Sequence, residues 1–128
     1  MFLKQIHHVA IICSNYEVSK DFYVRILGLT PMNEVYREER DSYKLDLLVN
    51  DTYQIELFSF PNPRERLSYP EAAGLRHLAF EVEDMGQIVS FLQQEGVQPE
   101  PIRVDPYTSK RFTFFPDLDG LPIELYEA

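Results

Sequence analysis

Apolar and polar residues alternate along several short stretches of this chain, which is the pattern of strands with one buried face. Two of these stretches, residues 6–13 and 75–82, resemble each other closely. In the first, Val9 and Ile11 would share one face of the sheet. His8 would lie on the opposite face, so we expect it to point away from the apolar core.

A helix is predicted directly after each of these two stretches. Its N-cap would be Ser14 or Asn15 in the first case and Asp84 in the second. Gly28 and Gly96 stand where a helix end would use the left-handed backbone conformation. Each helix is therefore bracketed by a polar start signal and a glycine stop signal.

Three strand-like runs follow each helix, separated by turn signals such as "VND" and "DLDG". The six runs are residues 33–37, 44–49 and 54–60, then 102–105, 111–115 and 122–126. Each half of the chain thus reads as β-α-β-β-β. The stretch between the halves, "PNPRERLSYPEAAG", is rich in proline and charge and is predicted to be a loop.

The two halves are copies of one unit that keep their register from end to end. His8 matches His77 at an offset of 69 residues, and Glu56 matches Glu124 at an offset of 68. We therefore predict one domain over residues 1–128, of class α+β. It would contain two tandem βαβββ modules, one at about residues 1–60 and one at about 74–128. A linker over residues 61–73 would join them.

Composition and charge narrow the classes of function. The 128 residues carry a net charge of −9, which argues against binding to nucleic acid or to anionic membranes. No apolar run approaches the roughly 20 residues of a membrane span, and no signal peptide is evident, so we expect a cytoplasmic protein. Cys13 is the only cysteine, which rules out an internal disulfide and cysteine-based zinc sites.

The repeated histidine and glutamate form the candidate chemistry. By strand alternation His8, Glu56, His77 and Glu124 all point away from the helices, in the middle of apolar stretches where an unpaired charge is costly. Imidazole and carboxylate together suit Ni, Zn, Co, Mn or Fe(II). The rival interpretation is that both sheet faces are exposed to solvent and that the histidine–glutamate pairs have no function. His7 has no counterpart, because Arg76 precedes His77, so it is predicted to be dispensable for metal binding.

These motifs, "HHVAI", "SKDFYVRILGL", "QIELF", "LRHLAFEV" and "DLDGLPIELYE", resemble the glyoxalase/bleomycin-resistance/extradiol-dioxygenase superfamily, also called vicinal oxygen chelate. The C-terminal stretch is similar to the YaeR-like group of glyoxalase-I-like metalloproteins. The resemblance implies paired βαβββ modules that form a curved mixed sheet around a metal cavity, a homodimer and a small-molecule substrate. It also implies that the two histidines and two glutamates bind a divalent metal, with nickel or zinc first.

The resemblance further implies a lyase or isomerase that acts on a small α-hydroxycarbonyl or 2-oxo compound. A metal-stabilised enediolate would form while a carboxylate transfers the proton. Glu124 is our first candidate for that base and Glu56 the second. Two alternatives stay open: a protein that sequesters a small ligand, and an Fe(II) extradiol-type dioxygenase, which the presence of Glu56 disfavours.

Two positions depart from glyoxalase I. Its arginine and asparagine anchors for glutathione correspond here to Ile12 and Phe60, which argues against a glutathione conjugate as substrate. Together with Phe58 and Tyr126, these apolar residues are predicted to line the substrate cavity. Packing of these rings against one another is the alternative.

Overall fold

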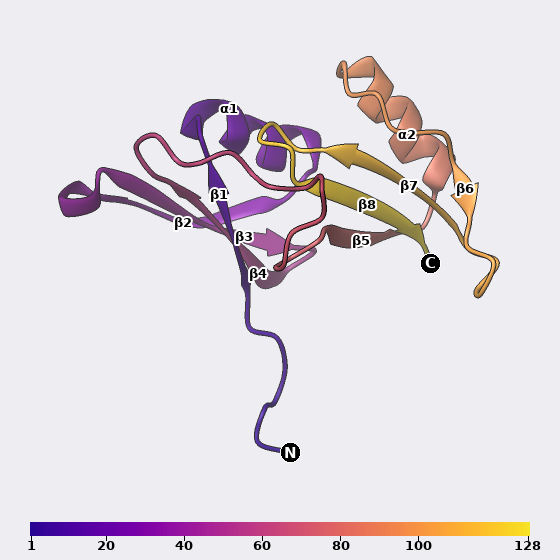
Figure 1. Cartoon of the computed structure of the whole chain (residues 1–128), viewed down its shortest axis with the longest axis horizontal. Helices are drawn as coiled ribbons and strands as arrows, with labels where there is room; N and C mark the ends of the chain where they lie inside the picture. Colours follow the sequence, from indigo (N-terminus) through magenta and orange to yellow (C-terminus); the bar gives the residue numbers. More distant parts are fainter. The chain divides into compact units, whose positions relative to one another are not determined.

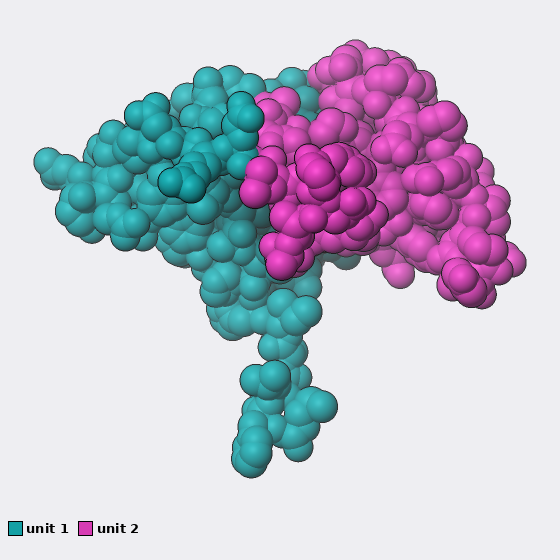
Figure 2. Space-filling view, viewed as in Figure 1, with its two compact units in different colours: residues 1–65 teal, residues 66–128 magenta.

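The structure is a computed structural model that describes all 128 residues (Figure 1). The chain divides into two compact units, Met1–Glu65 and Arg66–Ala128 (Figure 2). Each unit contains one four-stranded mixed sheet and one α-helix. The predicted α+β class and the βαβββ order of both halves are therefore confirmed.

The first unit forms its sheet in the order β1-β4-β3-β2. β1 runs parallel to β4, and the other two pairings are antiparallel. A π-helical turn continues α1 over Phe22–Ile26, and a short 3-10 turn joins β2 to β3. The elements are β1 Val9–Cys13, α1 Tyr16–Asp21, β2 Thr30–Arg37, β3 Ser42–Val49 and β4 Thr52–Ser59.

The second unit repeats this topology in the order β5-β8-β7-β6. Here β5 runs parallel to β8, and β7 is antiparallel to both of its neighbours. The elements are β5 Leu78–Val82, α2 Met85–Gln94, β6 Arg103–Val104, β7 Arg111–Pro116 and β8 Pro122–Glu127. The first and last strands of the unit, β5 and β8, therefore lie side by side, as β1 and β4 do in the first unit.

The apolar side chains of alternate strand positions form the core of each unit on the side of its helix. In the first unit Leu47 and Leu57 are fully buried, and α1 contacts β4. In the second unit Ile123 and Leu92 are fully buried, and α2 contacts β8. Burying side chains of this size contributes roughly 1.5–3 kcal/mol each, so this face determines which way the strands that carry them are turned.

Both predicted helix starts are observed. The Asn15 side chain accepts a hydrogen bond from the Val18 amide at 3.2 Å, and Asp84 accepts one from the Gln87 amide at 3.0 Å. Of the two candidates at the first helix, Asn15 is thus the N-cap. No helix of the structure is long and apolar enough to cross a membrane.

The strand boundaries differ from the prediction at one functionally relevant place. Strand pairing begins only at Val9 and Leu78, so His8 and His77 each stand directly before a strand rather than inside it. The alternation nevertheless continues through them. Ala10 and Ala79, two residues later, are paired with Glu56 and Glu124.

Candidate metal centre

The first unit brings His8 and Glu56 together on the sheet face that points away from α1. Strand pairing aligns β1 with β4, and the His8 Nε2 atom lies 3.4 Å from a carboxylate oxygen of Glu56. Glu56 is only 6% exposed, and its immediate strand neighbours are the core residues Ile55 and Leu57. A nearly buried carboxylate needs partners, and His8 is one of several.

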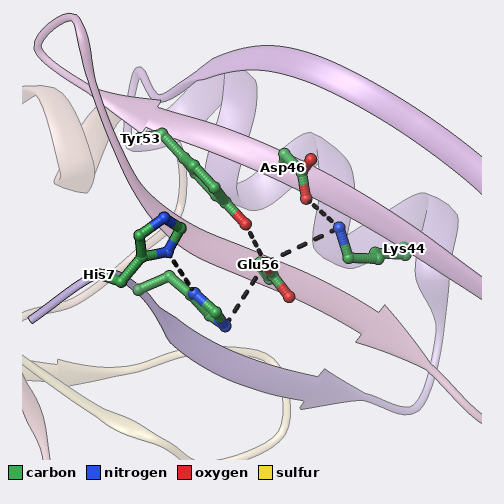
Figure 3. Close-up of polar contacts among 6 residues, drawn as sticks. His7, Lys44, Asp46, Tyr53 and Glu56 are labelled. Atoms are coloured by element: carbon green, nitrogen blue, oxygen red, sulfur yellow. Dashed lines mark hydrogen bonds and ion pairs between the residues drawn. The ribbon is translucent and has the colours of Figure 1, made fainter.

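The other partners of Glu56 come from β3 and from the start of β4 (Figure 3). The Tyr53 hydroxyl donates a hydrogen bond to the Glu56 carboxylate. The ammonium group of Lys44 lies 3.8 Å from the same carboxylate and 2.6 Å from that of Asp46. These contacts hold the Glu56 side chain in one position.

His7 lies against His8 rather than apart from it. The two Nδ1 atoms are 2.9 Å apart, and the His8 ring stacks on Tyr53 with an interplanar angle of 5°. His8 therefore directs Nε2 toward Glu56 and Nδ1 toward His7. A neutral His8 that carries its proton on Nδ1 would donate it to His7 and leave Nε2 free to bind a metal.

The second unit contains the matching pair with different surroundings. The His77 Nε2 atom lies 3.3 Å from a carboxylate oxygen of Glu124. The residue paired with Glu124 on the neighbouring strand is Phe114, whereas Glu56 is paired with Asp46 at the equivalent place. The Phe114 ring meets His77 edge to face at 5.1 Å. Glu124 thus has an aromatic neighbour where Glu56 has a charged one.

The donor chemistry of each pair suits a divalent cation, since an imidazole nitrogen and a carboxylate oxygen already face the same space. No group of three or more His, Cys, Asp or Glu side chains in the chain is arranged to hold a metal ion. Each unit thus offers two candidate ligands, one imidazole and one carboxylate.

The residues predicted to line a cavity lie on the same sheet faces, in two different settings. In the first unit Ile12 is 54% exposed, and the Phe58 and Phe60 rings stack with their centroids 6.1 Å apart. In the second unit Tyr126 stacks on Phe112 and donates a hydrogen bond to Asp105 at 2.8 Å. The Thr108 hydroxyl lowers the pKa of Tyr126, but Asp105 and burial outweigh it, so the pKa is raised and the phenol stays neutral.

Comparison with known proteins identifies the family. The model of the Glyoxalase/Bleomycin resistance protein/Dioxygenase superfamily matches residues 5–125. The chain belongs to this superfamily. It is 64% identical over 125 residues to the uncharacterized protein YaeR of Escherichia coli (strain K12), covering 98% of this chain and 97% of that one.

Other relatives match over their full lengths. The uncharacterized protein YwkD of Bacillus subtilis (strain 168) is 63% identical over 127 residues, which is 99% of each chain. The crystal structure of a glyoxalase family protein from Enterococcus faecalis superposes with a TM-score of 0.90 at 50% identity, covering 99% of this chain and 100% of that one. The predicted superfamily, and within it the resemblance to YaeR, are thereby confirmed.

Several polar residues around Glu56 were not predicted from the sequence. Alternation places Lys44 and Asp46 on the face of Glu56, but their proximity depends on the pairing of β3 with β4. Tyr53, three residues before Glu56, would lie on the opposite face of a regular strand. A bulge at this end of β4 pairs Tyr53 with Leu48 and Ile55 with Leu47, which turns Tyr53 to the side of Glu56.

Proposed function

We propose that this protein is a divalent-metal-dependent, glyoxalase-I-like lyase or isomerase that acts on a small α-hydroxycarbonyl or 2-oxo compound. The observation that carries the proposal is the repeated pair: His8 with Glu56 at 3.4 Å and His77 with Glu124 at 3.3 Å, at equivalent places of two copies of one unit. Membership of a superfamily whose name includes glyoxalases supports it.

In this proposal His8, Glu56, His77 and Glu124 hold the metal, nickel or zinc in the first place and cobalt, manganese or iron otherwise. The two pairs would come from one chain or from the two chains of a homodimer. When bound, a divalent cation stabilises negative charge on two neighbouring substrate oxygens, as an enediolate requires. The protein's own task is then to bind the substrate, exclude water and move one proton.

In this proposal Glu124 transfers the proton, and the difference between the surroundings of the two glutamates supports this choice. Tyr53 and Lys44 hold the Glu56 carboxylate, so moving it would break contacts worth roughly 1 kcal/mol or more each. The Glu124 carboxylate lies 3.3 Å from the His77 Nε2 atom, and the residue paired with it on the neighbouring strand is the aromatic Phe114. A base must approach the carbon that loses the proton and then withdraw, which suits the less constrained carboxylate. Glu56 would serve as a fixed ligand.

The test is metal analysis of protein that was purified without a metal-binding tag. We expect close to one divalent metal ion for each set of four ligands, and we expect the variant His8→Ala to lose it. Glu127→Gln is a matched control, because Glu127 lies on the strand of Glu124 but forms an ion pair with Arg111 at 2.6 Å. It should keep the metal.

Wild-type protein without bound divalent metal, or a His8→Ala variant that retains it, would show the four-ligand proposal to be wrong. Metal-free protein that nevertheless binds small molecules tightly would favour sequestration instead. The hemithioacetal of methylglyoxal and glutathione should not be turned over, because Ile12 and Phe60 offer no polar group to its carboxylates.

A further inference from the structure

We propose that Arg37 binds an anionic group of the substrate, a carboxylate or a phosphate, on the same sheet face as His8 and Glu56. This inference rests on the proposed function, because it assumes that the reacting end of the substrate lies at the histidine–glutamate pairs. Arg37 ends β2 and is paired with Ser42, which lies on the same sheet face as Lys44 and Asp46.

The Arg37 guanidinium is placed by aromatic rings. Its central carbon lies 4.9 Å from the centroid of the Phe58 ring and 5.6 Å from that of Phe60. One terminal nitrogen donates a hydrogen bond to the Ser42 hydroxyl at 2.9 Å. The central carbon of the Arg40 guanidinium lies 5.3 Å from the Phe60 centroid. Stacking and one hydrogen bond fix the plane of the guanidinium and leave most of its donors available.

Arg37 also lacks the partner that basic side chains elsewhere in this acidic protein have. The chain has 21 acidic and 12 basic residues, and most of the basic residues in the sheets and helices form ion pairs with carboxylates. Arg37 forms none, although Glu38, Glu39 and Asp41 follow it closely in the sequence. Its Nε atom is the one buried side-chain nitrogen or oxygen atom without a hydrogen-bond partner. A planar donor without an acceptor is what a bound carboxylate or phosphate would satisfy.

The second unit has the opposite charge at the equivalent position. Asp105 stands 68 residues after Arg37, just as Tyr126 stands 68 residues after Phe58. Asp105 accepts hydrogen bonds from the Tyr126 hydroxyl and the Tyr107 amide, both at 2.8 Å. Its polar group is thus satisfied within the unit, whereas that of Arg37 is not. The two copies have diverged at this position, where only the first unit has a basic side chain that could bind an anionic ligand.

The spacing limits the size of the ligand. Phe58 lies two residues beyond Glu56 on one face of β4, which corresponds to about 7 Å along the strand. The guanidinium stacked on Phe58 would therefore meet an anionic group about 7–10 Å from the reacting carbons. The substrate class would be a 2-oxo or α-hydroxycarbonyl compound with a carboxylate or phosphate at the far end of a short chain.

The experiment titrates metal-free protein with glutarate, with inorganic phosphate and with the uncharged diamide of glutarate. The readouts are calorimetry and the 1H–15N signal of the Arg37 Nε–H group. We expect glutarate or phosphate to bind and to move this signal, and the diamide to do neither. The tighter of the two anions identifies the group that the site prefers. Arg37→Gln should weaken binding by about tenfold or more, and Arg37→Lys should restore it in part.

Arg103→Gln is the matched control, because Arg103 also lies over two phenylalanine rings but has Glu100 as a partner at 3.3 Å. It should bind the anion as the wild type does. Absence of anion binding, or an Arg37→Gln variant that binds normally, would overturn the inference. So would an equal loss in Arg103→Gln. Since the titration uses no metal, failure of this inference and failure of the proposed metal site give different experimental results.

Discussion

The contact between His7 and His8 changes the prediction made from the sequence, in which His7 is dispensable for metal binding. We now expect His7 to strengthen metal binding through His8 without binding the metal itself. His8 presents Nε2 to Glu56 at 3.4 Å while its Nδ1 faces the Nδ1 of His7 at 2.9 Å. Replacing His7 with alanine removes the acceptor that keeps the His8 proton on Nδ1. The other tautomer of His8 then competes, in which Nε2 carries the proton and cannot bind a metal.

The size of the effect follows from the setting of this contact. Loss of a hydrogen-bonded partner behind a metal-binding histidine typically costs 10–100-fold in metal affinity. His7 and His8 are both exposed, so water can replace part of the lost contact. We therefore expect His7→Ala to weaken binding by about tenfold, which is about 1.4 kcal/mol. His8→Ala removes the ligand itself and should exceed the upper end of that range.

The assay is competition for zinc or nickel between the protein and a chromogenic chelator at pH 7. His7→Asn is the control, because its side-chain oxygen can accept at the position of Nδ1 and should restore most of the affinity. The free energy of unfolding of the metal-free protein should be unchanged in His7→Ala and His7→Asn, since His7 is exposed and precedes β1. A His7→Ala variant that binds as tightly as the wild type would refute this account. If His7→Asn does not restore the metal affinity, the hydrogen bond from His8 is not the cause of the loss in His7→Ala.

Two further predictions concern stability. Asp84→Ala should lower the free energy of unfolding by about 1 kcal/mol in urea denaturation, because the cap of α2 on the Gln87 amide is lost; an unchanged midpoint would contradict the cap. The ammonium group of Lys20, followed by the Tyr16 hydroxyl, holds the pKa of Glu34 below its ordinary value of 4.5. Glu34→Gln should therefore destabilise the protein at neutral pH. The difference from wild type should shrink below pH 4.5 and vanish once the pH is below the lowered pKa of Glu34 in the folded protein. A difference that persists at low pH would rule out this ion pair as its cause.

Much of the fold could be predicted from the sequence because the chain contains the same pattern twice. Alternation alone separates Ile55 and Leu57 from Glu56 and fixes which of them enters the core. The repeat then selects His8 over His7 as the counterpart of His77. Polar start signals and glycines placed both helices correctly, since capping depends on residues that are local in the chain.

The surroundings of the pairs could not be predicted, because they depend on the register between strands. Lys44 approaches Glu56 only because β3 pairs with β4 as it does. Tyr53 reaches Glu56 only through a bulge, which reverses the alternation that a sequence pattern assumes. Arg37 is one basic residue among twelve in the sequence, and its lack of an ion-pair partner is visible only in three dimensions.

Comparison of the two units with each other gives the strongest argument that the pairs have a function. Asp46 in the first unit corresponds to Phe114 in the second, and Arg37 corresponds to Asp105, so charge and polarity have changed around both pairs. The histidine and glutamate remain, with nearly equal distances of 3.4 Å and 3.3 Å. If these sheet faces were solvent-exposed without a function, the histidine–glutamate pairs should have diverged as freely as their neighbours. Retained pairs in divergent surroundings therefore support the proposal that this histidine and this glutamate bind a metal.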